Sequence, residues 1–188
     1  MRTQRIILGL DPGTNLMGFG IIKKTEKSLI ALQYGVINMN KEKNHMKKLR
    51  IIFEKVTELI NEYKPHEISI ESPFYGKNVQ SMLKLGRAQG AAITAGEISK
   101  IKVSEYAPKK IKQSVTGNGN ASKEQLSDMV KRILNLKLKK DDKLDATDAL
   151  GAAICHLYQK SSNQTTKKSW KQYLLSLIHI SEPTRPID

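Results

Sequence analysis

Acidic side chains occur in this chain where they are unusual, at the ends of apolar segments and inside an apolar helix pattern. Asp11 ends the run IILGL, and Glu71 ends the alternating segment EISIE. Asp145 and Asp148 are spaced i, i+3, so both project from one face of a helix that is otherwise mostly alanine and leucine. Carboxylates in such places can bind a divalent cation, which makes these four residues the candidates for chemistry.

A simpler structural role is available to each of these acids. Aspartate before Pro-Gly commonly starts a turn, which would account for Asp11. Acids in the first turn of a helix complement its dipole, each by roughly 0.3–1 kcal/mol. Asp141 and Asp142 are better placed for that dipole role, so structural and chemical roles both stay open for Asp145 and Asp148.

The four acids make sense together if the strands that end at Asp11 and Glu71 are neighbours in a sheet. Four carboxylates would then converge at one end of the sheet, where they repel one another unless cations lie between them. Hard oxygen ligands suit Mg²⁺ or Mn²⁺, and the chain has no Cys/His set for zinc. Two such ions, about 3.5–4 Å apart, would hold the attacking water and the leaving oxygen of a phosphodiester.

The spacing of apolar residues predicts the elements that must position these acids. Three strands come first and then strands alternate with helices, a pattern that predicts an α/β fold with a mixed sheet and helices on both faces. Pro65 ends the first helix, and Ser122 is a good N-cap for the helix KEQLSDMVKRIL. The predicted strands are 5–10, 17–23, 28–38, 67–72 and 101–105, and the predicted helices are 43–63, 78–99, one from about Pro108, one after Ser122, and 142–159.

The charge of the chain points to a polyanionic partner. Its 188 residues carry 32 Lys and Arg against 18 Asp and Glu, a formal net charge of +14. Nucleic-acid phosphates attract such a surface, with an anionic membrane surface as the competitor. No apolar run approaches the roughly 18 residues of a membrane span, and no signal peptide opens the sequence. Cys155 is the single cysteine, so we expect no disulfide and a cytoplasmic location.

The composition changes near the C-terminus, where we expect a domain to be followed by a tail. Residues 1–160 carry the periodic segments and are expected to form one domain. From Ser161 the sequence SSNQTTKKSW is polar and without periodicity, so residues 161–188 are expected to be disordered. The final stretch, SLIHISEPTRPID, resembles the translated read-through of a sequencing adapter and is excluded from fold reasoning.

Several stretches together resemble the RuvC family of crossover junction endodeoxyribonucleases: ILGLDPGTNLMGFGII, ISIESPFYGKNVQSMLKLGRAQGAA, SEYAPKKIKQSVTGNGNASKEQL and KLDATDALGAAICH. They cover most of residues 4–158 in the family's order and spacing. The resemblance implies an RNase H-like fold of the retroviral-integrase superfamily, with a mixed five-stranded sheet whose first and fourth strands are adjacent. Residues 1–160 would then be the nuclease domain.

The same resemblance implies an activity and partners. It implies a homodimer that resolves Holliday junctions during recombination and repair, by symmetric nicking of two opposing strands of four-way junction DNA. The cut would leave a 5′-phosphate and a 3′-hydroxyl. The family binds two divalent metals per subunit, so we expect two Mg²⁺ ions, with Mn²⁺ as a substitute. The RuvA–RuvB branch-migration complex is the implied protein partner.

All four acids match acids of the family, which implies that they are catalytic and metal-binding. The implied assignment gives Asp11 to both ions, Glu71 to one ion, and Asp145 and Asp148 to the other. His156, two helical turns past Asp148, is expected to be structural.

DNA contacts are expected beside the acids. The segment FYGKN follows shortly after Glu71, and the turn around Phe74 favours an exposed wedge that stacks on an unpaired base over packing in the core. Lys112 and Lys123 match family lysines near the active site, where a cation can stabilise the charge of the transition state. The expected DNA-contact residues are Phe74, Tyr75, Lys77, Asn78, Arg87, Lys112 and Lys123.

Other roles are open to several residues in and near this set. Asn78 can cap the helix that follows it, and Arg87 can belong to a helix face of small residues instead of contacting phosphate. Gly86 and Gly90 permit another helix to approach closely, in a dimer interface or in tight packing on the sheet. His45 is expected to lie at the surface.

Three rival functions compete with junction cleavage. An ATPase of the actin and sugar-kinase type would share the turn DPGTNLMGFG, but it needs two related lobes and 188 residues hold one. An RNA-processing nuclease of the YqgF-like group would share the first motif, whereas IESPFYGKN and DATDAL favour the resolvase. A non-catalytic junction-binding module would be expected to lack an acid, and all four are present.

Overall fold

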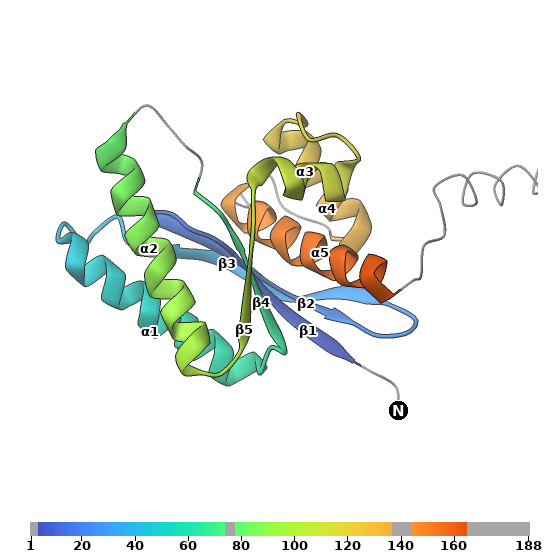
Figure 1. Ribbon diagram of the computed structural model, residues 1–188, viewed down its shortest axis with the longest axis horizontal. Helices are drawn as coiled ribbons and strands as arrows, with labels where there is room; N and C mark the ends of the chain where they lie inside the picture. Colours follow the sequence, from blue (N-terminus) through green and yellow to red (C-terminus); the bar gives the residue numbers. More distant parts are fainter. Residues whose placement is uncertain (1–3, 74–77, 137–143, 165–188) are drawn as a thin grey trace, which may run out of the picture. The chain divides into compact units, whose positions relative to one another are not determined.

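The strands and helices of the computed structural model follow the order that the apolar spacing predicts (Figure 1). The structure describes residues 4–73, 78–136 and 144–164. Its strands are β1 (Arg5–Asp11), β2 (Leu16–Lys24), β3 (Leu29–Asn38), β4 (Glu67–Glu71) and β5 (Lys102–Tyr106). Its helices are α1 (His45–Tyr63), α2 (Val79–Ile98), α3 (Pro108–Thr116), α4 (Lys123–Leu134) and α5 (Leu144–Gln164).

Local sequence explains where the helices begin and end. Ser122 caps α4 in a capping box with Gln125, as the sequence predicts. Asn44 caps α1 by accepting hydrogen bonds from two backbone N–H groups of the first turn. Lys64, with a left-handed φ of 47°, ends α1 just before Pro65.

The last helix continues past its predicted end at 159, to Gln164. Residues 161–164, which we expected in a disordered tail, are therefore helical, because polar residues without glycine or proline do not stop a helix that has already begun. The rest of the predicted tail lies outside the described residues. The described residues up to Leu157 form one compact unit. None of the helices in the described ranges has the length and apolar character needed to cross a membrane.

The sheet order brings the first and fourth strands together, as the carboxylate hypothesis requires. The strands lie in the order β3-β2-β1-β4-β5. β1 is antiparallel to β2, and β2 to β3, whereas β4 runs parallel to both β1 and β5. Because parallel strands end at the same edge of a sheet, the acids that end β1 and β4 come to one edge.

Alternation along the strands divides the apolar residues between two cores. Leu8 and Leu10 pack with α1 and α2, whereas Ile7 packs with α3, α4 and α5 on the other face. Figure 1 shows the same layers, with α1 and α2 on one side of the sheet and α3 to α5 on the other. The predicted α/β class, with a mixed five-stranded sheet and helices on both faces, is confirmed.

Glycines in β1 and β2 allow α5 to lie against the backbone of the sheet. A Cβ atom added to Gly9 would overlap the carbonyl oxygen of Ala149, and one added to Gly18 would overlap that of Asp145. Any side chain at these two positions would push the helix outward. Because Gly9 and Gly18 have no side chains, α5 can lie close to the sheet and bring its acids near β1.

Candidate active site

The ends of β1 and β4 place two of the predicted acids side by side. Leu10 lies opposite Ile70 in the parallel pair, and the next residues along the two strands are Asp11 and Glu71. Successive side chains of a strand point to opposite faces, so both carboxylates lie on the face that α5 covers, opposite to the face of Leu10 and Ile70.

The helix α5 brings the other two acids to this edge. The hydroxyl of Ser69 donates a hydrogen bond to the carbonyl oxygen of Ala152 at 2.7 Å, which fixes the helix to β4. Gly18, opposite the end of β1, leaves room for the backbone of Asp145. Asp145 lies in the first turn of α5, where it also complements the helix dipole, and Asp148 is buried one turn further on.

The carboxylates form a compact cluster. One oxygen from each of Asp11, Asp145 and Asp148 lies within 4.8 Å of the others. Glu71 lies beside this trio, close enough for its charge to raise the pKa of Asp11. The four acids singled out in the sequence therefore come to one edge of the sheet, from two strands and one helix.

Burial and crowding raise the pKa of Asp11, Glu71 and Asp148. Burial, followed by the charges of Glu71 and Asp148, raises the pKa of Asp11 to about 8. Burial and the charge of Asp148 raise the pKa of Glu71 to about 7, against the opposing charge of Lys123. Burial also raises the pKa of Asp148, although a hydrogen bond from Lys123 counteracts it. Such a cluster ionises fully only when positive charge enters it.

Two of the expected DNA-contact lysines lie at the acids. Nζ of Lys123 lies 2.7 Å from Oδ2 of Asp148. Burial alone would lower the pKa of Lys123, but the hydrogen bond and charge of Asp148 outweigh burial and raise it. Lys112 and Lys123 both line a cleft of about 560 Å³ that also contains Glu71 and Asp148. The cleft thus holds cations and carboxylates together, as a site for a metal-bound phosphodiester requires.

The donor set fits a hard divalent cation. All four side chains supply carboxylate oxygens, the ligands that such ions prefer. Oδ1 of Asp148 is buried and has no hydrogen-bond partner among the described residues. Because a buried polar atom without a partner is costly, a bound cation would satisfy this oxygen and offset the repulsion within the cluster.

The other expected DNA-contact residues have different outcomes. Phe74, Tyr75 and Lys77 lie outside the described residues. Asn78 is the N-cap of α2, and its side-chain oxygen accepts a hydrogen bond of 3.1 Å from the backbone N–H three residues later, so its capping role is confirmed. Arg87 is exposed on α2 and is not among the residues that line the acidic cleft.

Gly86 and Gly90 do not pack on the sheet, so that alternative is wrong. Both are exposed on α2, and a Cβ atom added to either would meet nothing within 4 Å. Val79 and Leu83 lie on the same face of the helix and are 65% and 52% exposed. This face of α2, defined by these four residues, is open within the described chain.

Some residues of the site were missed in the sequence. Lys109, Gly119 and Asn120 line the acidic cleft, and the available signal was the loop GNGNAS between two basic helices. His45, which we expected at the surface, is only partly exposed, and its Nε2 atom is buried. Its position depends on how the first turns of α1 and α2 meet, which the spacing of residues does not reveal.

Comparison with known proteins places the chain in a family. Residues 7–156 match the family described as Crossover junction endodeoxyribonuclease RuvC. A relative with that same name from Christiangramia forsetii is 53% identical over 168 residues, which cover 89% of this chain and 86% of the relative. The family match therefore spans every acid of the cluster and the cleft lysines Lys109, Lys112 and Lys123.

Solved structures agree with this result. The structure of RuvC from Thermus thermophilus is 26% identical, with a TM-score of 0.74 over 84% of this chain and 96% of that one. A second structure of that protein, in complex with a Holliday junction substrate, is 24% identical and has the same fold, with a TM-score of 0.74 over the same shares of the two chains. The predicted RNase H-like fold is confirmed. The chain belongs to the RuvC family of crossover junction endodeoxyribonucleases.

Proposed function

We propose that this chain is a crossover junction endodeoxyribonuclease that resolves Holliday junctions by nicking two opposing DNA strands. The observation that carries the proposal is the carboxylate cluster, in which oxygens of Asp11, Asp145 and Asp148 lie within 4.8 Å of one another beside Glu71. The net charge of +14 supports a polyanionic substrate. Metal dependence follows from the acidic cluster together with the family.

We assign the four acids as catalytic residues and metal ligands, for two Mg²⁺ ions per subunit that Mn²⁺ can replace. In this assignment Asp11 serves both ions, Glu71 serves one, and Asp145 and Asp148 serve the other. A bound divalent ion supplies a Lewis acid that polarises the phosphodiester and lowers the pKa of the attacking water. The raised pKa values of Asp11 and Glu71 support this assignment, because these groups lose protons when a cation binds.

The cleft lysines would act on the phosphate itself. Lys112 and Lys123 are placed to offset charge that develops on the phosphate oxygens, and Asp148 orients Lys123 through their 2.7 Å contact. Water attack at phosphorus would leave a 5′-phosphate and a 3′-hydroxyl.

The segment between β4 and α2 would meet the junction beside the cut. Glu71 ends β4 and Asn78 caps the start of α2, so the chain that joins these two elements starts at the acidic cluster. We propose that Phe74 is a wedge that stacks on an unpaired base, and that Tyr75 and Lys77 contact the nearby DNA. Asn78 and Arg87 are proposed as weaker contacts at the start and on the exposed face of α2.

We also propose that the protein acts as a homodimer and works with the RuvA–RuvB branch-migration complex. Symmetric cleavage of two opposing strands calls for two active sites. The open face of α2 supports a dimer, since exposed Val79 and Leu83 flank exposed Gly86 and Gly90 on one side of the helix. Small residues beside apolar ones allow a second helix to approach closely. The partnership with RuvA–RuvB rests on the family alone.

Two alternatives are less well supported. An RNA-processing nuclease of the same fold would use a similar acidic cluster, but the relative that is 53% identical is a crossover junction endodeoxyribonuclease. A non-catalytic junction-binding module would have no need of four clustered acids, among which Asp11 and Glu71 have strongly raised pKa values, because such a cluster repels DNA unless a metal is bound.

The decisive experiment compares a labelled synthetic four-way junction with a linear duplex of the same sequence. Each substrate is incubated with the protein in Mg²⁺ or in EDTA, beside an Asp11→Asn control. We expect paired, symmetric nicks in the junction alone, only with Mg²⁺ and only with Asp11 present.

Two results would overturn the proposal. Binding of the junction without cleavage in Mg²⁺ or Mn²⁺ would point to a binding module. Equal cleavage of every duplex, or cleavage of RNA in preference to the junction, would favour the RNA-processing alternative.

A further inference from the structure

A second hollow lies on the other face of the sheet, where α1 and α2 begin. It is a pocket of about 240 Å³, formed by the turn after Asp11 and the first turns of the two helices. We call it the anion pocket, and define it by Asn15, Lys43, His45, Lys48, Ser81 and Lys84. None of these residues belongs to the acidic cleft.

The charges around the anion pocket are all positive. Lys43, just before α1, Lys48 of α1 and Lys84 of α2 all line it, and no carboxylate lines it in the described part of the chain. Nζ of Lys48 donates to the neutral side-chain oxygen of Asn15 at 2.6 Å, so this contact leaves the positive charge uncompensated. Glu42, three residues before His45, instead accepts a hydrogen bond from the backbone N–H of residue 44. Converging lysines repel one another, and an anion between them would relieve that repulsion.

His45 supplies a further group that a ligand would satisfy. Its Nε2 atom is buried without a hydrogen-bond partner among the residues that the structure describes. Burial, followed by the charges of Arg87, Lys84 and Lys48, lowers the pKa of His45, so its ring is neutral near pH 7. A neutral imidazole carries one N–H, which can donate to an anionic oxygen. The same electrostatic coupling places Arg87 near the pocket and away from the acidic cleft.

The volume of the anion pocket and its position near the acids favour a phosphate group of a polymer as its ligand. Pockets that enclose whole small molecules usually have about 300–1,000 Å³, and this one is smaller. The turn that contributes Asn15 follows Asp11 directly, and Asn78, the N-cap of α2, is seven residues after Glu71. A nucleic acid cut at the acids would therefore pass close to the pocket.

We propose that the anion pocket binds a backbone phosphate of the junction DNA other than the phosphate that is cut, an inference that rests on the proposed function. Lys48, Lys84 and His45 provide its charge and hydrogen bonds. Contacts to phosphates fix the register of a protein on DNA without reading its sequence. The pocket thus holds one arm of the junction so that the scissile phosphate lies at the four acids.

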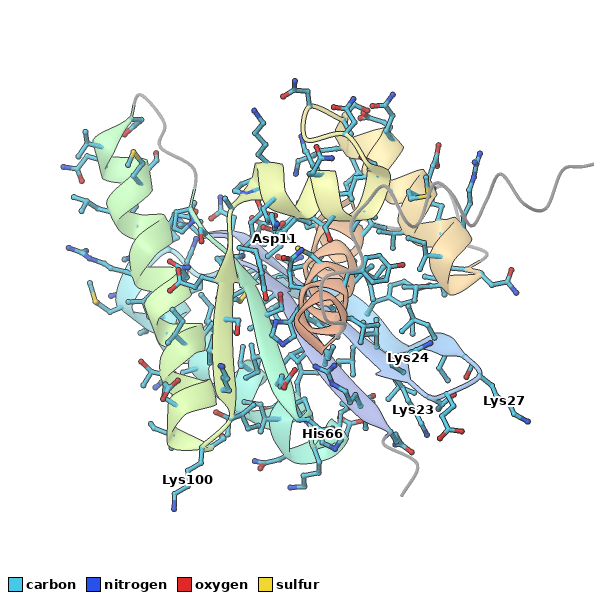
Figure 2. All side chains as sticks on the ribbon, turned by 45° about the vertical axis from the view of Figure 1, so that its right-hand side comes forward. Asp11, Lys23, Lys24, Lys27, His66 and Lys100 are labelled. Carbon is cyan, nitrogen blue, oxygen red and sulfur yellow. The ribbon has the colours of Figure 1, made fainter. Side chains whose placement is uncertain are left out.

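The first test uses the salt dependence of junction binding, measured by fluorescence anisotropy in EDTA so that no DNA is cut. Lys84→Gln removes one charge from an exposed helix position, and Lys27→Gln removes one from the exposed β2–β3 turn. Figure 2 shows Lys27 at the end of the sheet away from Asp11. We expect Lys84→Gln to weaken binding and to reduce the slope of log K against log salt by about 1, with no such change for Lys27→Gln.

The second test observes the histidine rings by NMR. The probes are the four-way junction and, separately, inorganic phosphate. His66 serves as the internal control, because Figure 2 shows it far from Asp11, and its Nδ1 accepts a hydrogen bond from the backbone N–H of Ile6. We expect the junction to shift the His45 signals and to leave those of His66 in place, and we expect Lys84→Gln to reduce the His45 shift.

The outcomes separate this inference from the proposed function. An unchanged salt slope for Lys84→Gln, with His45 signals that the junction does not move, would overturn the pocket while junction cleavage stands. Strong binding of inorganic phosphate that the junction does not displace would also overturn it, in favour of a small free anion. Loss of junction cleavage in the wild-type chain would instead refute the proposed function.

Discussion

The two ends of β4 carry the same side chain in opposite circumstances. Glu67 begins the strand and Glu71 ends it, and both point to the face of α5. Glu67 accepts a hydrogen bond of 2.6 Å from Arg5 and pairs with Nε2 of His156 at 2.7 Å. Glu71 has no ion pair with any residue in the described ranges, and its pKa is raised to about 7.

This difference indicates a structural role for Glu67 and a role in the reaction for Glu71. The Glu67 carboxylate is compensated within the fold, since Arg5 supplies positive charge and both Arg5 and His156 form hydrogen bonds with it. His156 in turn forms a hydrogen bond with the hydroxyl of Tyr106 at 2.8 Å. The expectation that His156 is structural agrees with these contacts. At Glu71, burial and the charge of Asp148 outweigh the opposing charges of Lys123 and Lys112, so a bound cation is needed to compensate the carboxylate fully.

The sharpest test of the comparison makes the same substitution at the two ends. Glu71→Gln is expected to slow junction cleavage by about 10²–10³-fold, because it removes an electrostatic group at the reacting phosphate, while the protein stays folded. Glu67→Gln keeps an acceptor for Arg5 and is expected to retain most of the cleavage rate. Cleavage assays and thermal unfolding of both variants measure the contrast. Equal loss of cleavage in the two would remove the distinction.

Removing a partner of Glu67, at the compensated end of β4, is expected to lower the stability of the protein. His156→Ala leaves the charge of Glu67 with one partner fewer and opens space at a residue that is 1% exposed. We expect a loss of about 3 kcal/mol in the free energy of unfolding, measured with urea. His66→Ala, at an exposed histidine near the same end, is the matched control and should change little. A loss below about 1 kcal/mol for His156→Ala would show that the pair is not structural.

Displacing α5 should impair the acidic cluster at the Glu71 end of β4, because it moves Asp145 and Asp148 without changing any charge. Gly18→Ala places a methyl group against the carbonyl of Asp145, and we expect a loss of about 1–3 kcal/mol in stability together with slower cleavage. Gly151→Ala, within α5 itself, is the control, since its added methyl group would meet only side-chain atoms, at 3.4 Å or more. There the lower cost of alanine in a helix should raise stability by about 0.5–1 kcal/mol. If Gly18→Ala were as stable as the wild-type protein, α5 could not lie directly against the backbone of β2 at Gly18.

The smallest expected effect is a dependence of folding stability on pH in the metal-free protein. The pKa of Asp11 is raised to about 8 and that of Glu71 to about 7, so between about pH 4 and 8 the folded protein holds protons that the unfolded chain has lost. The stability from these groups is therefore complete below about pH 4 and is lost progressively as pH rises, until the loss is complete above the folded pKa values of about 7 and 8. Mg²⁺ should raise the melting temperature more at alkaline than at acidic pH. In Asp11→Asn this difference should shrink, and parallel curves for the two proteins would contradict the raised pKa.

Much of this arrangement could be predicted from the sequence, because periodicity is a local property. The alternating and helical spacings predicted every strand and helix in order, and the acids at strand ends predicted the cluster once β1 and β4 were neighbours. The end of α5 was missed since polar residues do not mark where a helix stops.

The remaining features depend on contacts between distant segments. The pairing of Glu67 with Arg5 and His156 joins three elements, and no spacing along the chain encodes it. The anion pocket likewise forms where a turn meets the starts of α1 and α2. His45 is close to Lys48 in sequence, but its neighbour Lys84 comes from another helix.

The glycines beneath α5 also have a genetic consequence. Every amino-acid replacement that one nucleotide change can produce from a glycine codon adds a side chain. At Gly9 and Gly18 each of these replacements would strike the backbone of α5 and move the helix that carries Asp145 and Asp148. Two codons far in sequence from those of Asp145 and Asp148 are thus also expected to tolerate missense mutation poorly.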